Sequence, residues 1–189
     1  MKTGKVLILP GWQNSGPAHW QSLWAAQHGY TRVEQHDWDR PLRGDWIARL
    51  EDVVQAESAA APGAPITLVA HSLGCILVAA WATISRSTHH VGCALLVAPG
   101  DIERDEIRPM LPSWSPIPRQ KLPFPARLLG SRNDPYCILE RAQSFSDAWG
   151  CRFTDCGELG HINGESGLGA WPAGHDMLLA LQQDTRPIQ

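Results

Sequence analysis

Ser72 stands in a sequence context that suits nucleophilic catalysis. The chain around it reads Ile66-Thr67-Leu68-Val69-Ala70-His71-Ser72-Leu73-Gly74, an apolar run that leads into a serine between small residues. A serine hydroxyl is a weak nucleophile, so it needs a neighbouring base and hydrogen-bond donors for the oxyanion that forms. A sharp turn from a strand into a helix presents the hydroxyl in this way, and it requires small residues two positions away on either side. Ala70 and Gly74 meet this requirement, with alanine where glycine is more usual.

Ser72 also fits a simpler structural role. Serine is a preferred N-cap, and an aliphatic helical pattern follows it directly. Its position after an apolar strand favours the catalytic interpretation. The N-terminus of the following helix would also direct backbone N–H groups toward a developing negative charge. We therefore expect Ser72 to be the nucleophile and the backbone N–H of Leu73 to be one oxyanion donor.

His161 is the candidate base. Where a serine nucleophile follows a strand of a parallel sheet, the acid and the histidine commonly come later in the chain. Four histidines follow Ser72, namely His89, His90, His161 and His175. The first two precede a predicted strand, at the edge of the sheet away from the chemistry, and His175 is expected at the surface. His161 follows the last predicted strand in a glycine-rich loop, where it can act as a base or serve as a turn residue.

Two aspartates are candidates for the acid that orients the histidine. Asp134 follows the fifth predicted strand in Asn133-Asp134-Pro135, and Asp101 follows the fourth. Either carboxylate could stabilise an imidazolium. An aspartate in Asn-Asp-Pro is also a common turn former, so the residues alone leave both candidates open.

Aromatic residues are candidates for the rest of the site. The first predicted strand ends in Pro10-Gly11-Trp12, and the backbone N–H of Trp12 is the expected second oxyanion donor unless this is an ordinary loop. The chain has nine tryptophans, most of which we expect to pack in the core. Because large aromatic side chains commonly line concave sites, Trp12, Trp114 and Trp171 are predicted to shape an apolar acyl pocket.

The elements that would position these residues alternate between strand and helix. Strand patterns occur at residues 5–9, 32–36, 66–70, 91–97, 126–130 and 151–155, and helix patterns at 18–28, 45–60, 73–86, 138–149 and 174–183. Several strand patterns are continuously apolar, as in strands covered on both faces. This alternation predicts a compact α/β fold with a mostly parallel sheet of about six strands and helices on both faces. We expect Pro17 in the first turn of the first helix.

One segment interrupts the alternation. Residues 109–125 carry six prolines, with Trp114 near the middle. Long irregular segments of this kind are often lids or binding loops, and others are surface excursions. The sequence leaves these alternatives open.

Composition narrows the possible classes of protein. A chain of 189 residues with 43% hydrophobic residues suits one domain, residues 1–189. The net charge of −3 predicts no nucleic-acid partner, and the longest apolar run, Cys75–Trp81, predicts no membrane span. The apolar stretch after Met1 is too short for a signal peptide. Five cysteines without a C-x-x-C pair favour a reducing cytoplasm.

The sequence lacks the common cofactor-binding and metal-binding motifs. The chain contains no G-x-G-x-x-G after a strand, no G-x-x-x-x-G-K-[ST] and no H-E-x-x-H. A nucleotide-binding domain and a metal enzyme are therefore disfavoured, and we expect neither a cofactor nor a metal.

Several motifs together resemble the small serine hydrolases related to retinoblastoma-binding protein 9 and its bacterial relatives. These motifs are Pro10-Gly11-Trp12-Gln13-Asn14-Ser15-Gly16-Pro17-Ala18-His19-Trp20, His71-Ser72-Leu73-Gly74, Asn133-Asp134-Pro135, Gly160-His161-Ile162-Asn163 and Ser166-Gly167-Leu168-Gly169-Ala170-Trp171-Pro172. The resemblance implies an α/β-hydrolase with little or no cap, no cofactor and a triad of Ser72, Asp134 and His161. It thereby favours Asp134 over Asp101. The family name points to binding of retinoblastoma-type pocket proteins through a Leu-x-Cys-x-Glu segment. This chain has no such segment, so we do not expect that partner.

The expected activity is cleavage of a small-molecule ester or amide through an acyl-enzyme on Ser72. The alternative is a binding or regulatory protein on the same fold, with a slow or vestigial triad. The presence of all three residue types in the expected order favours the enzyme.

Overall fold

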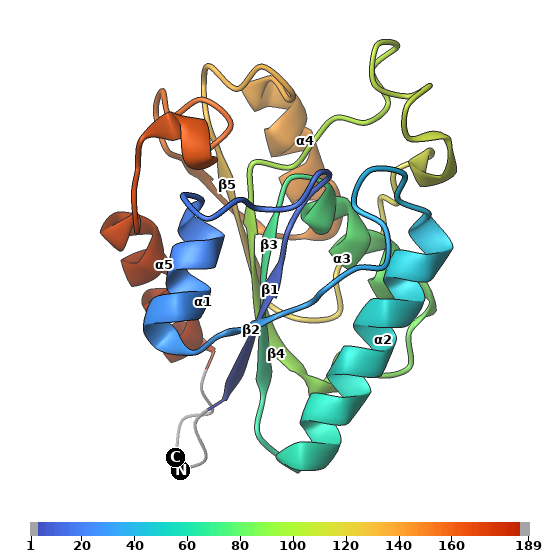
Figure 1. Cartoon of the computed structure of the whole chain (residues 1–189), viewed down its shortest axis with the longest axis vertical. Coiled ribbons are helices and arrows are strands. Elements are labelled where there is room, and N and C mark those ends of the chain that lie inside the picture. Colours follow the sequence, from blue (N-terminus) through green and yellow to red (C-terminus); the bar gives the residue numbers. More distant parts are fainter. Residues whose placement is uncertain (1–3, 186–189) are drawn as a thin grey trace.

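A six-stranded parallel sheet forms the centre of the molecule. The computed structural model describes residues 4–185, and its strands are β1 (Lys5–Leu9), β2 (Thr31–Arg32), β3 (Ile66–His71), β4 (Val91–Val97), β5 (Ala126–Gly130) and β6 (Arg152–Asp155). They lie in the order β2-β1-β3-β4-β5-β6, and every neighbouring pair is parallel. The predicted architecture is confirmed (Figure 1).

Helices cover both faces of this sheet. They are α1 (Trp20–His28), α2 (Arg43–Ala60), α3 (Leu73–Ile84), α4 (Leu139–Trp149) and α5 (Pro172–Asp184). Figure 1 shows α1 and α5 on one side of the sheet and α2 and α3 on the other. Two separate hydrophobic clusters correspond to these faces: one includes the buried residues of α2, α3 and α4, and the other those of α1 and α5. Among residues 4–185, no helix combines the length and apolarity that crossing a bilayer requires.

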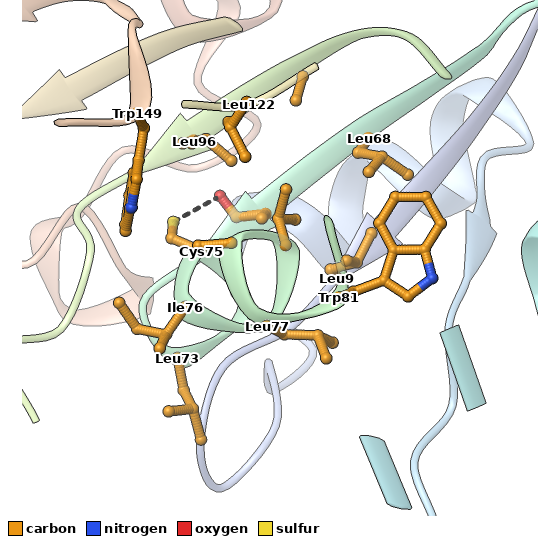
Figure 2. Close-up of a cluster of buried hydrophobic side chains, with 14 of the residues drawn as sticks. Leu9, Leu68, Leu73, Cys75, Ile76, Leu77, Trp81, Leu96, Leu122 and Trp149 are labelled. Atoms are coloured by element: carbon orange, nitrogen blue, oxygen red, sulfur yellow. Dashed lines mark hydrogen bonds between the residues drawn. The ribbon is translucent and has the colours of Figure 1, made fainter. Parts of the chain in front are cut away.

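Strand β3 and helix α3 form the most deeply buried part of the fold. All six residues of β3 are buried, and α3 buries side chains around most of its circumference. Figure 2 shows Trp81 of α3 beside Leu9 and Leu68 of the sheet, and Leu73 and Leu77 belong to the same cluster. Burial of each large aliphatic side chain contributes about 1.5–3 kcal/mol. The junction between β3 and α3 is therefore anchored by buried side chains on both elements.

Two local predictions need correction. Strand β2 was predicted over residues 32–36 but pairs only at Thr31 and Arg32. One more backbone bond, from Val33 N–H to the Ile8 carbonyl at 2.9 Å, follows before the chain leaves the sheet edge. Pro17 does not lie in the first turn of α1. His19 is the N-cap instead, and its Nδ1 accepts a hydrogen bond from the Gln21 N–H.

The proline-rich segment is packed onto the core along most of its length. It contains one short 3-10 helix, η2 (Pro112–Trp114), and buries five large side chains. These are Leu111, Trp114, Ile117, Leu122 and Phe124. The Trp114 indole N–H also donates to the Pro41 carbonyl at 2.9 Å. This anchoring makes most of residues 109–125 a fixed surface segment in this structure.

Candidate active site

Ser72 occupies the sharp turn between β3 and α3. Its backbone has φ 54° and ψ −120°, a conformation that is strained for any residue other than glycine. The side chain makes no capping hydrogen bond to α3, so the simple N-cap role does not describe it. Its Oγ instead lies 2.9 Å from Nε2 of His161. The turn thus directs the hydroxyl toward the candidate base.

Two glycines allow the end of β1 to lie against this turn. A Cβ on Gly74 would collide with the Leu9 carbonyl oxygen, and a Cβ on Gly11 would lie 2.8 Å from Cβ of Ser72. The same Gly11 position is 3.2 Å from the backbone nitrogen of Leu73. The chain that leads into Trp12 therefore passes beside the N-terminus of α3. Neither the Trp12 N–H nor the Leu73 N–H donates a backbone hydrogen bond to the chain between residues 4 and 185.

His161 joins Ser72 to Asp134. Its Nδ1 lies 2.9 Å from Oδ2 and 3.0 Å from Oδ1 of Asp134. A carboxylate only accepts hydrogen bonds, so the imidazole proton resides on Nδ1 and the lone pair of Nε2 faces Ser72. The backbone N–H of Tyr136 donates to Asp134 Oδ1 at 2.8 Å and fixes the carboxylate. This chain of three side chains can remove a proton from Ser72 and stabilise the resulting imidazolium.

The other candidate acid and bases lie elsewhere. Asp101 forms an ion pair with Arg141 at 3.2 Å rather than contacting His161. His90 precedes β4, at the opposite edge of the sheet, and its Nδ1 lies 2.9 Å from Ser58 Oγ. His175 is not a free surface residue, since its Nε2 lies 2.8 Å from the Tyr30 hydroxyl.

Side chains hold the loop that carries His161. The backbone carbonyl of His161 lies 2.9 Å from Nε2 of His71, and the next carbonyl, of Ile162, accepts from the Trp20 indole N–H at 2.7 Å. The Gly160 N–H donates to Asn133 Oδ1 at 2.7 Å. The sequence motifs contain His71, Trp20 and Asn133 but predict no role for them. His71 and Asn133 directly precede Ser72 and Asp134, which was the available signal, whereas no local pattern pointed to Trp20.

Two further imidazoles, those of His71 and His19, lie beside His161. The ring centroid of His71 is 4.8 Å from that of His161 and 4.7 Å from that of His19. Burial, reinforced by the charges of the neighbouring histidines, holds the pKa of His71 well below its usual value. Burial followed by the charges of His161 and Arg32 lowers the pKa of His19 to about 4. Both rings are therefore neutral at pH 7, and neither adds a cation that would oppose protonation of His161.

A cavity of about 490 Å³ opens onto Ser72 and His161. Its lining includes Trp12 as predicted, and Met110 and Leu111 from the proline-rich segment, for which a binding loop was one of the open alternatives. It also includes Ile102, Ile107 and Tyr136, for which the position downstream of β4 and β5 was the only signal available. The cavity lies at the carboxyl edge of the sheet, where ligands of open α/β folds bind.

Trp114 and Trp171 do not line this cavity, contrary to prediction. Trp114 is fully buried in the cluster under α2, and its ring packs edge-on against Trp46 at 5.2 Å. Trp171 is buried on the other face, at 5.3 Å from Trp20. Both indoles fill helix–sheet interfaces, where their large apolar area is removed from water.

Comparisons with known proteins concern the family and the fold of this chain. A family model described as serine hydrolase matches residues 6–180. No curated protein matches the chain. A YdeN-like hydrolase from Pectobacterium atrosepticum is 26% identical, with a TM-score of 0.81 over 98% of this chain and 94% of that one.

Two more distant structures share the fold. The ydeN gene product of Bacillus subtilis is 16% identical, with a TM-score of 0.72 over 95% of this chain and 98% of that one. An esterase from Thermogutta terrifontis with propionate bound is 18% identical, with a TM-score of 0.66 over 99% of this chain and 86% of that one. The predicted compact α/β-hydrolase fold is confirmed.

Proposed function

Because this chain belongs to the serine hydrolase family, we propose that it cleaves a small ester or amide through an acyl-enzyme on Ser72. The observation that carries the proposal is the continuous hydrogen-bonded path from Ser72 through His161 to Asp134, with contacts of 2.9 Å on either side of the imidazole. A vestigial site would have no need to keep a strained backbone and both of these contacts.

In the first half-reaction, Ser72 Oγ attacks the substrate carbonyl carbon while Nε2 of His161 takes the hydroxyl proton. Asp134 stabilises the imidazolium through Nδ1. The backbone N–H groups of Trp12 and Leu73 receive the oxyanion, and loss of one such donor typically costs about 3–4 kcal/mol of transition-state stabilisation. The imidazolium then gives its proton to the leaving alcohol or amine, and the acyl group remains on Oγ.

In the second half-reaction, water replaces the leaving group. Nε2 of His161 takes a proton from water as the oxygen attacks the acyl carbon, and the same proton returns to Ser72 Oγ as the acid departs. The propionate in the Thermogutta terrifontis esterase, a structural neighbour, supports a small acyl group. The motifs that resemble relatives of retinoblastoma-binding protein 9 support the same three catalytic roles, and a cytoplasmic location stays a prediction.

A fluorophosphonate probe tests this proposal directly. We expect stoichiometric labelling of the wild-type protein at Ser72 and hydrolysis of p-nitrophenyl acetate. Ser72→Ala should abolish labelling and lower kcat by about 10⁶-fold with an unchanged circular dichroism spectrum. Ser58→Ala, at a half-buried position of α2 that contacts His90 rather than His161, is the matched serine control and should label normally. A folded wild-type protein that does not label would instead support the binding or regulatory alternative.

A further inference from the structure

The candidate nucleophile lies where the two halves of the core meet at the sheet edge. Leu73, which follows Ser72, belongs to the hydrophobic cluster under α2, α3 and α4. Ile162, which follows His161, belongs to the cluster under α1 and α5. The serine and the base therefore reach each other from opposite faces of the sheet, and the cavity above them has one wall on each side.

The wall on the Leu73 side is apolar. It consists of Ile102, Ile107, Met110 and Leu111, which we call the apolar wall. Ile102 and Leu111 are part of the same cluster as Leu73, and Ile107 packs against it. The wall begins beside the nucleophile, because a Cβ on Gly100 would lie 3.5 Å from Ser72 Oγ and 4.0 Å from Cγ2 of Ile102.

The wall on the His161 side carries most of the polar side chains of the lining. These are Asn14, His19, Asn163 and Glu165, which we call the polar wall. Its two segments adjoin, since a Cβ on Gly164 would lie 3.7 Å from the backbone nitrogen of His19. Figure 1 shows the segment after β4 and the segment after β6 on opposite sides of the upper edge of the sheet.

Acyl transfer assigns a different part of the substrate to each wall. The base must protonate the leaving group, so the leaving group lies on the side of His161, while the acyl group stays on the serine and takes the other side. We propose, on the basis of the function above, that the substrate is an ester that joins an apolar acyl chain of several carbons to a hydroxyl-bearing alcohol. The apolar wall binds the chain, and the polar wall binds the alcohol.

The free polar groups of the polar wall suit hydroxyls. Among residues 4–185, Nε2 of His19 is buried and has no hydrogen-bond partner, and it carries the ring proton because Nδ1 accepts from the Gln21 N–H. The Glu165 carboxylate is exposed and forms no ion pair with the described part of the chain. A ring N–H donates and a carboxylate accepts, whereas a hydroxyl does both. An alkyl alcohol would leave the His19 N–H without a partner in the bound state, which weakens binding.

A set of three esters tests this assignment with wild-type enzyme. Propyl butyrate and propyl acetate differ by two methylenes of the acyl chain, and we expect about 16-fold higher kcat/KM for the butyrate, since each buried methylene is worth roughly fourfold. Glyceryl monobutyrate keeps the butyrate and the three-carbon alcohol but adds two hydroxyls. We expect its kcat/KM to exceed that of propyl butyrate by about fivefold, as for one or two net hydrogen bonds.

Two variants assign each preference to its wall. Ile107→Ser should lower the butyrate-to-acetate ratio at least threefold, whereas Ile84→Ser, an exposed isoleucine at the end of α3, should leave it unchanged. Glu165→Ala should lower the ratio of glyceryl to propyl butyrate, and Glu140→Ala on α4 should not.

The outcomes separate this inference from the proposed function. Fluorophosphonate labelling of Ser72 together with a ratio of one or less in either ester comparison would overturn the inference and leave the hydrolase intact. If a control variant changes an ester ratio as much as the matching wall variant does, the assignment of that preference to the wall is overturned. Absence of labelling would overturn both.

Discussion

His71 donates its Nε2–H to the backbone carbonyl oxygen of His161 at 2.9 Å, so the residue before the nucleophile holds the main chain of the base. The carbonyl can only accept, which places the proton of the neutral His71 ring on Nε2. Ser72 and His161 are thus tied together twice, once through the reacting atoms and once through a contact that takes no part in proton transfer.

Loss of this second contact should slow catalysis without weakening binding. In His71→Leu the base loop loses its donor, and a displacement of about 1 Å at a reacting group can cost about 10²-fold. We expect kcat to fall 10–100-fold with KM nearly unchanged. His71→Gln can place an amide N–H near the position of Nε2 and should recover most of the rate. Equal losses in both variants, measured by steady-state kinetics, would contradict a positioning role.

Asp134 is expected to be essential where Asp101 is not. Asp134→Asn can leave the contact with Nδ1 in place but favours the wrong imidazole tautomer, and in serine hydrolases such a change lowers kcat by about 10⁴-fold. Asp101→Asn weakens the ion pair with Arg141 and should affect stability more than turnover. The comparison needs kcat and the urea midpoint for each variant. Similar kcat values for the two variants would refute the assignment of the acid.

Contact between Gly74 and the Leu9 carbonyl makes this glycine sensitive to a single added methyl group. Gly74→Ala must push α3 away from the end of β1, and overpacking of this kind typically costs about 1–3 kcal/mol. Gly44→Ala on α2 meets no atom within 4 Å and should stabilise the protein by up to about 1 kcal/mol. Urea unfolding distinguishes the two. A Gly74→Ala protein as stable as wild type would show that β1 and α3 are not in close contact.

Acid should destabilise the protein partly through His19. Burial, followed by the charges of His161 and Arg32, lowers the folded-state pKa of His19 from 6.5 to about 4. Between these two values the unfolded chain binds the proton and the folded chain does not, so stability falls as the pH drops from 6.5 toward 4. His19→Asn retains a good N-cap and removes this titration. Between pH 7 and pH 4.5 the variant should lose less unfolding free energy than wild type; a larger loss would invert the expected sign.

The order of elements could be predicted because the strands are continuous apolar runs, and the structure keeps β1, β4 and β5 at their predicted bounds. The edge strand β2 is shorter than predicted because its polar residues have no second neighbouring strand to hold them. Ser72 and His161 stood out by residue type and by following strands, whereas the preference for Asp134 over Asp101 came from the family resemblance. The contacts of His71 and Trp20 with the base loop join positions 90 and 142 residues apart, which local patterns do not encode.

Cavity residues were the least predictable part of the site. The indoles of Trp114 and Trp171 were expected in the pocket but are buried between helices and sheet, where a large ring removes most apolar surface from water. The apolar wall comes from residues 102–111, an irregular segment without helical or strand periodicity. Its location depends on how the segment after β4 packs against α3, which only the folded chain shows.

Ser72 has a positive φ, which is strained for a residue other than glycine, so the side chain that catalysis requires lowers the stability of the fold. Backbone strain of this kind costs about 1–3 kcal/mol, and glycine would relieve it, offset in part by the roughly 0.5–1 kcal/mol of extra chain entropy that glycine loses on folding. Laboratory evolution that screens only for heat resistance should therefore accept Ser72→Gly and enrich chains that survive heating yet hydrolyse nothing. Any stabilisation campaign on this scaffold needs an activity screen in every round.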